Sequence, residues 1–226
     1  MRVALISDIH ANLAALEAVL GDIPAVDRIV CCGDLVDYYD QPNEVCALIR
    51  GRGIACIRGN HDAYVIGALP PKEENRSFYR TDWTRDVLAE THLRWLEGLG
   101  TEMRLEEHGR RLRLRHASPW DEETYLYADA ESALARVQMD RDETLAVGHT
   151  HRPLHLAIGE GWLLNPGSVG QPRDWDPRAS YAMLDMKTAD VEHRRVSYDV
   201  APVQRRLEAQ GWAPHIVSLL SRTREK

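Results

Sequence analysis

Short apolar runs alternate with amphipathic segments along the first 60 residues of the chain. Residues 2–7 and 28–32 are apolar runs that predict buried strands, and residues 54–57 predict a third. Residues 13–20 carry their apolar side chains on one helical face, and residues 42–50 begin with a proline suited to the first turn of a helix. Strands that alternate with helices indicate a parallel sheet joined by right-handed crossovers.

The pattern changes after residue 64. Residues 64–100 contain two adjacent prolines, a charged patch at 72–74 and then a helical pattern, which together predict a helical insertion or cap. From residue 103 onward strands dominate, and we expect them at residues 103–105, 112–114, 145–147, 154–158, 162–164, 181–184 and 191–198. Helical segments are expected at 129–137 and 202–210. Since no repeat or linker interrupts the chain, we expect a single domain over residues 1–226.

The net charge, the lack of long apolar segments and the cysteine spacing argue against several classes of protein. The chain has 28 Lys and Arg against 35 Asp and Glu, and its net charge of −7 argues against duplex nucleic acid or a membrane as a partner. The apolar run at the amino terminus is too short for a signal peptide, and no segment reaches the roughly 18 apolar residues of a membrane span. The four cysteines lack zinc or disulfide spacing. We therefore expect a cytoplasmic protein with buried thiols, ending in a solvated tail at 222–226.

Polar clusters follow five of the predicted strands directly, at residues 8–10, 33–37, 59–62, 116–119 and 148–151. The carboxyl ends of strands border the binding crevice of an open α/β sheet, so these clusters can converge on one site. Residues two apart in an extended segment project to the same side, so Asp8 can share a metal ion with His10, and His149 can reach the same crevice as His151. Carboxylate, amide and imidazole groups without thiolates suit a pair of divalent ions such as Mn, Fe, Co or Zn.

The same clusters form a known series of motifs. In order they read D-x-H, G-D-x-x-D, G-N-H-D, a single H and G-H-x-H, from Asp8 to His151. This series resembles the calcineurin-like metallophosphoesterase superfamily, and residues 165–174 resemble its bacterial small-phosphoesterase branch. The resemblance covers nearly the whole chain. It implies a four-layer α/β/β/α sandwich of two mixed sheets, as in metallo-dependent phosphatases.

The resemblance also implies a role for individual residues. One metal ion would be bound by Asp8, His10 and His151, a second by Asn60, His116 and His149, and both would share Asp34. Manganese is our first expectation for both ions, with Fe, Ni, Co and Zn as alternatives. His61 would act as the general acid, and Asp37 would hold its ring in orientation. The alternative for His61 is a role in capping or packing.

Substrate-binding residues are less well defined by the sequence. Eukaryotic protein Ser/Thr phosphatases with these motifs carry arginine directly after G-D-x-x-D, where this chain has Tyr38, so specificity for phosphoproteins is in doubt. Arg173 is the candidate phosphate contact, with an ion pair to Asp174 or Asp176 as the alternative. Asn12 either approaches the substrate or closes the turn before the first helix. Other residues expected to be structural are Asp62, as a helix cap, and Trp120, whose alternative is stacking on a base.

The implied function is hydrolysis of a phosphomonoester or phosphodiester of a small molecule or nucleotide. A hydroxide bridging the two metal ions would attack the phosphorus atom. One alternative is a nuclease or a dinucleoside-polyphosphate hydrolase. The arginines at 110–115 alternate with leucines, however, as a strand with one buried face requires. The other alternative is a non-catalytic metal-binding scaffold, but the sequence retains His61 and every expected ligand.

Overall fold

The first three apolar runs form one side of a mixed sheet. In the computed structural model, which describes residues 1–224, β1 (Arg2–Ile6) pairs in parallel with β2 (Arg28–Cys31), and β2 pairs in parallel with β3 (Ala55–Cys56). Two later strands complete this first sheet, since β9 (Ala179–Asp185) lies antiparallel to β1 and β10 (Val191–Val196) antiparallel to β9. The strand order is β10-β9-β1-β2-β3.

The middle of the chain forms a second mixed sheet. Its strands are β4 (Glu102–Glu107), β5 (Arg110–Arg115), β6 (Glu143–Ala146), β7 (Pro153–Ile158) and β8 (Gly161–Pro166), in the order β4-β5-β6-β8-β7. The outer pairs β4–β5 and β7–β8 are antiparallel hairpins, whereas β5–β6 and β6–β8 are parallel. Every strand predicted from the sequence overlaps one of these elements, although β3 is only two residues long.

The two sheets pack face to face around a shared core. Successive residues of a strand point in turn into this core and into a core on the other side of the sheet. Val3 and Leu5 of β1 point into the core between the sheets, together with Leu112 and Leu114 of β5. The intervening Ala4 and Ile6 belong to a second core, on the helical side of the first sheet. The arginines of β5 alternate with these two buried leucines, as the sequence predicted for a strand with one buried face.

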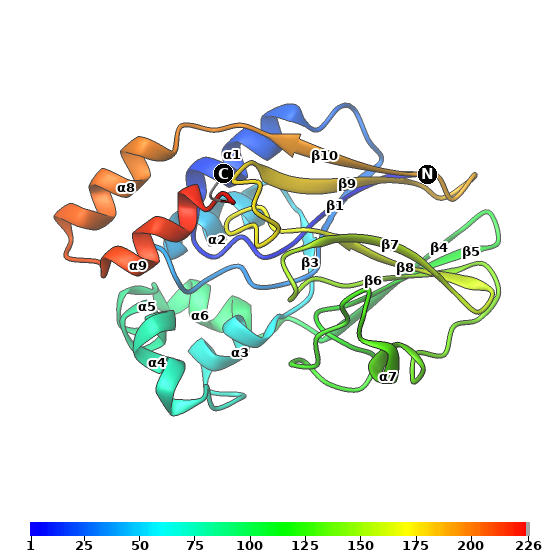
Figure 1. The fold of residues 1–226 in the computed structure, drawn as a ribbon, viewed down its shortest axis with the longest axis horizontal. Helices are drawn as coiled ribbons and strands as arrows, with labels where there is room; N and C mark the ends of the chain where they lie inside the picture. The colour runs from blue at the N-terminus through cyan, green and yellow to red at the C-terminus, as the bar shows by residue number, and fades with distance from the viewer. Residues whose placement is uncertain (225–226) are drawn as a thin grey trace.

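Helices cover both outer faces. The helices α1 (Leu13–Asp22) and α2 (Pro42–Gly51) bury Leu16 and Ile49 against the first sheet. The second sheet is covered by a thinner layer, in which short helix α7 (Glu131–Leu134) and its flanking loops pack over Leu145 and Leu163 (Figure 1). The four-layer α/β/β/α architecture expected from the sequence is therefore confirmed.

Residues 60–97 form four helices in succession, in the region where the sequence predicted a helical segment, and its description as an insertion or cap stays a prediction. They are α3 (Asn60–Ile66), α4 (Glu73–Tyr79), α5 (Thr81–Val87) and α6 (Glu90–Glu97). The sequence suggested one longer helix around residues 87–96, but the chain breaks between α5 and α6. Asn43 fixes this break, because its side chain donates to the Val87 carbonyl and accepts from the Ala89 amide, each at 2.8 Å.

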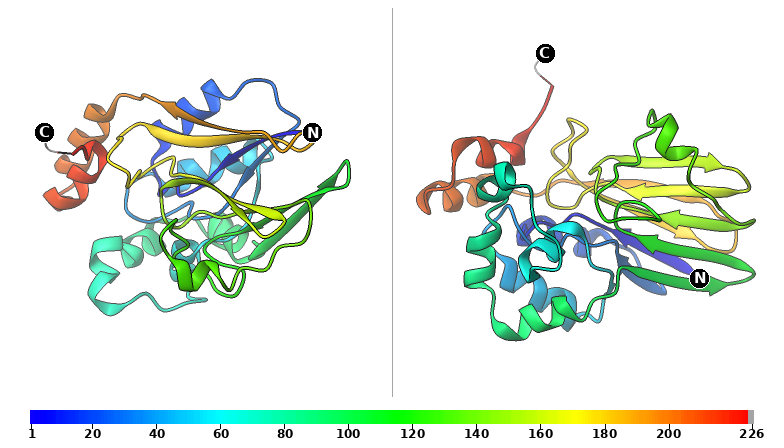
Figure 2. Two further views of the ribbon diagram at one scale, coloured as in Figure 1. Left: turned by 45° about the vertical axis from the view of Figure 1, so that its right-hand side comes forward. Right: turned by 90° about the horizontal axis from the view of Figure 1, so that it is seen from below.

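The chain ends in helices that lie beside the insertion (Figure 2). The predicted last helix is α8 (Val200–Ala209), and it is followed by α9 (Pro214–Val217) and the 3₁₀ helix η1 (Ser218–Ser221), which the sequence did not predict. Trp212 meets Trp83 of α5 edge to face at 4.8 Å.

Part of the predicted solvated tail, residues 225–226, lies outside the described residues. No helix in residues 1–224 has the length and apolar character needed to cross a bilayer. The expected single domain stays a prediction.

Candidate metal centre

The seven expected ligands converge at one end of both sheets. Each lies in the segment that follows a strand: Asp8 and His10 follow β1, Asp34 follows β2, Asn60 follows β3, His116 follows β5, and His149 and His151 follow β6. All seven are buried, and we call them together the candidate metal centre. The convergence expected from the strand ends is present, although the ligands come from two sheets rather than from one.

Several of these residues have an unusual backbone conformation. The φ angles of Asp8, His10, Asp34, His149 and His151 are +53°, +50°, +56°, +64° and +57°, in the left-handed region that non-glycine residues rarely adopt. Each such residue costs of order 1 kcal/mol or more, and the cost is tolerated where the surrounding structure fixes the loop. The sharp turns at these positions direct the side chains toward the centre.

Two motif glycines are needed because the loops approach closely. A Cβ atom at Gly59 would lie 2.1 Å from Oδ1 of Asp34, and one at Gly148 would lie 2.0 Å from Oγ of Ser7. Neither distance is possible between non-bonded atoms. The glycines that precede Asn60 and His149 therefore allow the loops carrying these ligands to pack against the loops after β1 and β2.

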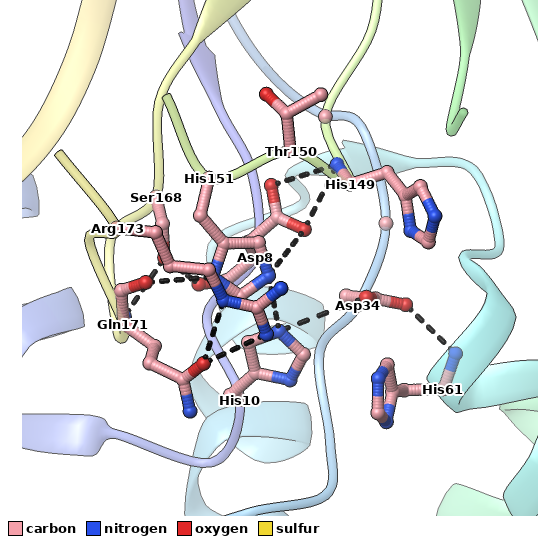
Figure 3. Close-up of polar contacts among 12 residues, drawn as sticks. Asp8, His10, Asp34, His61, His149, Thr150, His151, Ser168, Gln171 and Arg173 are labelled. Carbon is pink, nitrogen blue, oxygen red and sulfur yellow. Dashed lines mark hydrogen bonds and ion pairs between the residues drawn. The ribbon is translucent and has the colours of Figure 1, made fainter. Parts of the chain in front are cut away.

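The first group of ligands surrounds the space between β1 and the loop after β6. Nε2 of His10 lies 3.1 Å from Nε2 of His151 and 3.6 Å from Oδ2 of Asp34. Oδ1 of Asp8 lies 3.4 Å from the same nitrogen of His151 (Figure 3). These four side chains place their ligand atoms within 4.8 Å of one another, as a shared metal ion requires.

The second group shares Asp34 with the first. Oδ2 of Asp34 lies 3.2 Å from Nε2 of His116, and Oδ1 of Asn60 lies 2.9 Å from both Nε2 of His116 and Nδ1 of His149. Although Oδ2 of Asp34 is buried, it has no hydrogen-bond donor among the described residues. A buried carboxylate oxygen without a donor is costly unless a cation satisfies it.

The outward nitrogens of the four histidines contact backbone carbonyls, which leaves their inward nitrogens directed at the centre. The outward Nδ1 atoms of His10, His116 and His151 contact the carbonyls of Val36, Cys32 and Gln171 at 3.1, 2.8 and 2.6 Å, and the outward Nε2 of His149 contacts the carbonyl of Glu123 at 2.9 Å. Carbonyls only accept, so these nitrogens carry the protons. In neutral rings the inward nitrogens are then acceptors that face other acceptors. A cation between them would resolve this repulsion, so the residues fit a divalent metal ion.

Burial and the Asp34 charge set the protonation of these groups. Burial lowers the pKa of His10 and His151 well below the ordinary value and that of His149 to about 3, which keeps the three rings neutral. Burial also disfavours protonated His116, but the neighbouring Asp34 carboxylate outweighs it and raises the pKa of His116 to about 10. Since a ligand nitrogen must be free, a metal ion displaces this proton on binding.

His61 lies beside the centre and is held by a carboxylate. Its Nδ1 donates to Oδ2 of Asp37 at 3.0 Å. Its backbone amide donates to Oδ1 of Asp34 at 2.9 Å, a contact drawn in Figure 3. Oδ2 of Asp37 also accepts from Oγ1 of Thr81 at 2.9 Å. We call His61, Asp37 and Thr81 the His61 cluster. The sequence predicted the pair of His61 and Asp37, but it contained no signal for Thr81.

Arg173 reaches the same site from the loop after β8. Its Nε and Nη2 donate to Oε1 of Gln171 at 3.1 and 2.9 Å, and Nη2 also donates to the Tyr38 hydroxyl at 3.1 Å. Two other ion pairs occupy the carboxylates that the sequence offered as alternatives, since Asp174 pairs with Arg195 and Asp176 with Arg178. Arg173 therefore points into the site, and Tyr38 helps to hold it there.

Asn12 is a structural residue in this geometry, which corrects its expected place among the substrate contacts. Its Oδ1 accepts from the amide of Ala15 at 3.2 Å as the N-cap of α1. Its Nδ2 donates to the Gly170 carbonyl and the Tyr198 hydroxyl, both at 3.0 Å. These three bonds use the side chain's oxygen and both of its N–H groups, so the turn-closing interpretation is favoured.

Two further interpretations concern Asp62 and Trp120. Asp62 accepts from the amide of Gly59 at 3.0 Å, as expected for a cap of α3. It also accepts from the amides of Asp34 and Leu35 at 3.0 and 2.9 Å, so it ties the loop after β2 to α3. Trp120 packs beneath the guanidinium of Arg136, 3.9 Å from its ring centre, in the core outside the second sheet.

A cavity of about 190 Å³ opens onto the centre. Besides predicted site residues and Tyr38, its lining includes six residues that sequence analysis missed, namely Tyr64, Lys72, Asn75, Tyr79, Glu123 and Tyr125. Tyr64 could have been found, because it lies three residues after His61 and hence on the same face of α3. The other five lie in segments that carry no motif.

Comparison with known proteins places this geometry in a family. The family described as the calcineurin-like phosphoesterase superfamily domain matches residues 1–189. An uncharacterized protein of Methanocaldococcus jannaschii, MJ0912, is 36% identical in an alignment 222 positions long that covers 88% of each chain. The phosphodiesterase YfcE of Escherichia coli is 45% identical over 47 residues, which are 21% of this chain and 25% of that protein.

A solved structure agrees with the sequence matches. The metallophosphoesterase from Sphaerobacter thermophilus superposes with a TM-score of 0.83 at 34% identity and covers 98% of both chains. The family match, the similar structure and the clustered Asp and His side chains all point to a metal-dependent phosphoesterase fold. The chain belongs to the calcineurin-like phosphoesterase superfamily.

Proposed function

We propose that the protein hydrolyses the phosphate ester of a small molecule or nucleotide, and that it uses two divalent metal ions, with manganese as first choice. One observation carries the proposal: two groups of inward-facing acceptors share Asp34, whose buried Oδ2 has no hydrogen-bond donor among the described residues. When bound, two such ions supply charge that polarises phosphoryl oxygens and lowers the pKa of a coordinated water.

The side chains around the centre have separate tasks in this proposal. Arg173 is held by Gln171 and Tyr38 with its guanidinium at the cavity, where it can bind the oxygens of a phosphoryl group. His61 also lines the cavity, and its Nδ1 is occupied by Asp37. Its Nε2 is therefore free to donate a proton to the leaving-group oxygen as the ester bond breaks.

The shape of the cavity supports a small substrate. His61 is only 4% exposed and His149 only 6%, so the reacting phosphate must enter a recess. A cavity of about 190 Å³ suits a phosphate and part of one organic group. The backbone of a nucleic acid duplex is too broad to enter such a recess. Tyr64, Tyr79 and Tyr125 in the lining make nucleotide esters suitable candidates.

The experiment uses two generic esters, para-nitrophenyl phosphate and bis-para-nitrophenyl phosphate. The protein is stripped of metal and supplied separately with Mn, Ni, Co, Zn and Mg. We expect a transition metal to restore hydrolysis, and the preferred ester distinguishes a phosphatase from a phosphodiesterase. If every metal binds and neither ester is hydrolysed, the proposal fails in favour of a non-catalytic scaffold.

A further inference from the structure

The Asp37 carboxylate is held by only two hydrogen bonds in the described residues, and both are to the same oxygen. Oδ2 accepts from Nδ1 of His61 at 3.0 Å and from Oγ1 of Thr81 at 2.9 Å, whereas the buried Oδ1 has no donor. All three residues of the His61 cluster are buried. Thr81 therefore supplies the one hydrogen bond to this carboxylate, other than that of His61 itself, among the described residues. The buried hydroxyl of Thr84 also acts on the carboxylate by lowering the pKa of Asp37, but it makes no hydrogen bond of normal length to it.

We infer that Thr81, the first residue of α5, is a positioning residue that orients His61 for proton donation by fixing the Asp37 carboxylate. This inference rests on the proposed hydrolase function. Thr81 is neither an expected metal ligand nor one of the residues that line the cavity, and its side chain donates a hydrogen bond to Asp37. The helical insertion thereby contributes directly to the orientation of the general acid, in addition to lining the cavity with Lys72, Asn75 and Tyr79.

The backbone next to Thr81 holds the same loop at a second point. The amide of Tyr38 donates to the carbonyl of Tyr79 at 2.9 Å. Asp37 and Tyr38 have φ angles of +70° and +66°, so their loop is in a conformation that must be held by its surroundings. Tyr79 and Thr81, two residues apart, thus fix two adjacent residues of the loop that carries Asp37.

The residue between these two contacts is held by the carboxyl-terminal segment. Arg80 has a φ of +65° at the junction of α4 and α5, and its guanidinium carbon lies 4.0 Å from the ring centre of Trp212. Trp212 in turn donates from Nε1 to the carbonyl of Tyr38 at 2.9 Å. Trp212 lies beyond residues 1–189, which match the family, so a segment outside that match supports the orientation of His61.

The dependence of the hydrolysis rate on the leaving group distinguishes this positioning role from a loss of structure or of metal. A poor leaving group such as phenolate needs a proton in the transition state, whereas para-nitrophenolate leaves readily without one. A defect in orienting His61 should therefore slow phenyl phosphate much more than para-nitrophenyl phosphate. A general loss of structure, or a loss of metal, would slow the two esters equally.

The experiment compares Thr81→Val, Thr81→Ala and Thr81→Ser with the wild-type protein loaded with manganese. Val keeps the shape of Thr without the hydroxyl, and Ser keeps the hydroxyl without the methyl. The matched control is Thr91→Val, because Thr91 is exposed near the start of α6 in the same insertion. We expect Thr81→Val to lower kcat for phenyl phosphate about tenfold, a part of the 10²–10⁴-fold effect of a whole general acid. The kcat for para-nitrophenyl phosphate should change by less than about twofold, and metal content should stay unchanged.

The Ser and Ala variants distinguish the effect of losing the Thr81 hydroxyl from the effect of altered packing. Thr81→Ser should restore the rate with phenyl phosphate, whereas Thr81→Ala should not, and this pair gives the answer even if Thr81→Val does not fold. Equal losses on both esters, or equal rates for the Ser and Ala variants, would overturn the inference while leaving the hydrolase function intact. A wild-type protein that hydrolyses neither these two monoesters nor bis-para-nitrophenyl phosphate would overturn both the inference and the hydrolase function.

Discussion

The candidate metal centre and the His61 cluster hold their histidines by different means. In the centre, the outward nitrogens of His10, His116, His149 and His151 all contact backbone carbonyls. His61 instead relies on the side chain of Asp37, which itself relies on Thr81 from the insertion. A backbone carbonyl is held in place by the main chain, whereas a carboxylate can rotate once a donor is removed.

Because of this difference, metal binding and proton donation should depend on different regions of the molecule. The positions of the metal ligands depend on the two sheets and the loops that follow their strands, so metal binding should tolerate changes in α4 and α5. The proposed proton donation by His61 would depend on the packing of α5 against the loop after β2, and on the carboxyl-terminal segment that contacts the same loop. Substitutions in the two regions should therefore have distinguishable effects on metal content and on turnover.

The largest effect is expected from Asp34→Asn. Asp34 is the residue shared by both ligand groups, and its carboxylate is the negative charge between them. Neutralising it removes a ligand from both ions, so we expect loss of both metals and of detectable hydrolysis, measured by plasma mass spectrometry and ester assays. Asp129→Asn, at an exposed position, serves as the control. A variant that still bound two metal ions would contradict the shared role of Asp34.

His61→Ala should give the next largest effect, and it should act on rate alone. Because His61 is not an expected ligand, metal content should stay near that of the wild type. The kcat for phenyl phosphate, whose leaving group needs a proton, should fall by a factor of about 10² to 10⁴. His108→Ala, on the turn between β4 and β5, provides a matched control on the surface. Full activity in His61→Ala would rule out its role as the general acid.

Arg173→Gln should have a smaller effect, on substrate binding. A charged hydrogen bond to phosphate contributes about 1.5–3 kcal/mol, so kcat/KM should fall about 10- to 100-fold. Metal content should not change, because Arg173 is not among the ligands. The matched control is Arg178→Gln, whose arginine pairs with Asp176 outside the cavity. An unchanged kcat/KM would show that Arg173 does not contact the phosphate.

Asn12→Ala should have the smallest effect, and it should act on stability only. Loss of the N-cap bond to Ala15 should lower the free energy of unfolding by about 1 kcal/mol, as measured by urea denaturation. KM for either generic ester should stay at the wild-type value. A raised KM without any loss of stability would instead indicate that Asn12 contacts the substrate.

Much of the fold and of the metal centre could be predicted because short, continuous stretches of the sequence mark the strands and the polar residues that follow them. An apolar run followed at once by Asp8 and His10 marks the end of a buried strand and two polar side chains beyond it. The same holds for Asp34 after β2, and for His149 and His151 after β6. Since strand ends meet at one edge of a sheet, the grouping of Asp8, His10 and Asp34 followed from the order of strands. That His149 and His151 reach them from a second sheet did not follow from that order.

The remaining features depend on contacts between distant segments. The left-handed conformations of Asp8 and Asp34 occur in residues that do not favour them, so no glycine marks them in the sequence. Thr81 lies 44 positions from Asp37, in a short helix with no recognisable motif. The break between α5 and α6 depends on Asn43, from another helix. Helix α9 and η1 have four residues each, too few for a clear apolar period.

The central claim is that two ions share the Asp34 carboxylate, and anomalous diffraction from manganese-soaked crystals of the protein tests it most directly. The account predicts two anomalous peaks, one beside His10 and His151 and the other beside His116 and His149, with Asp34 between them. Soaked crystals of Asp34→Asn should lose both peaks. A single peak at saturating manganese, or peaks that do not touch Asp34, would contradict the account.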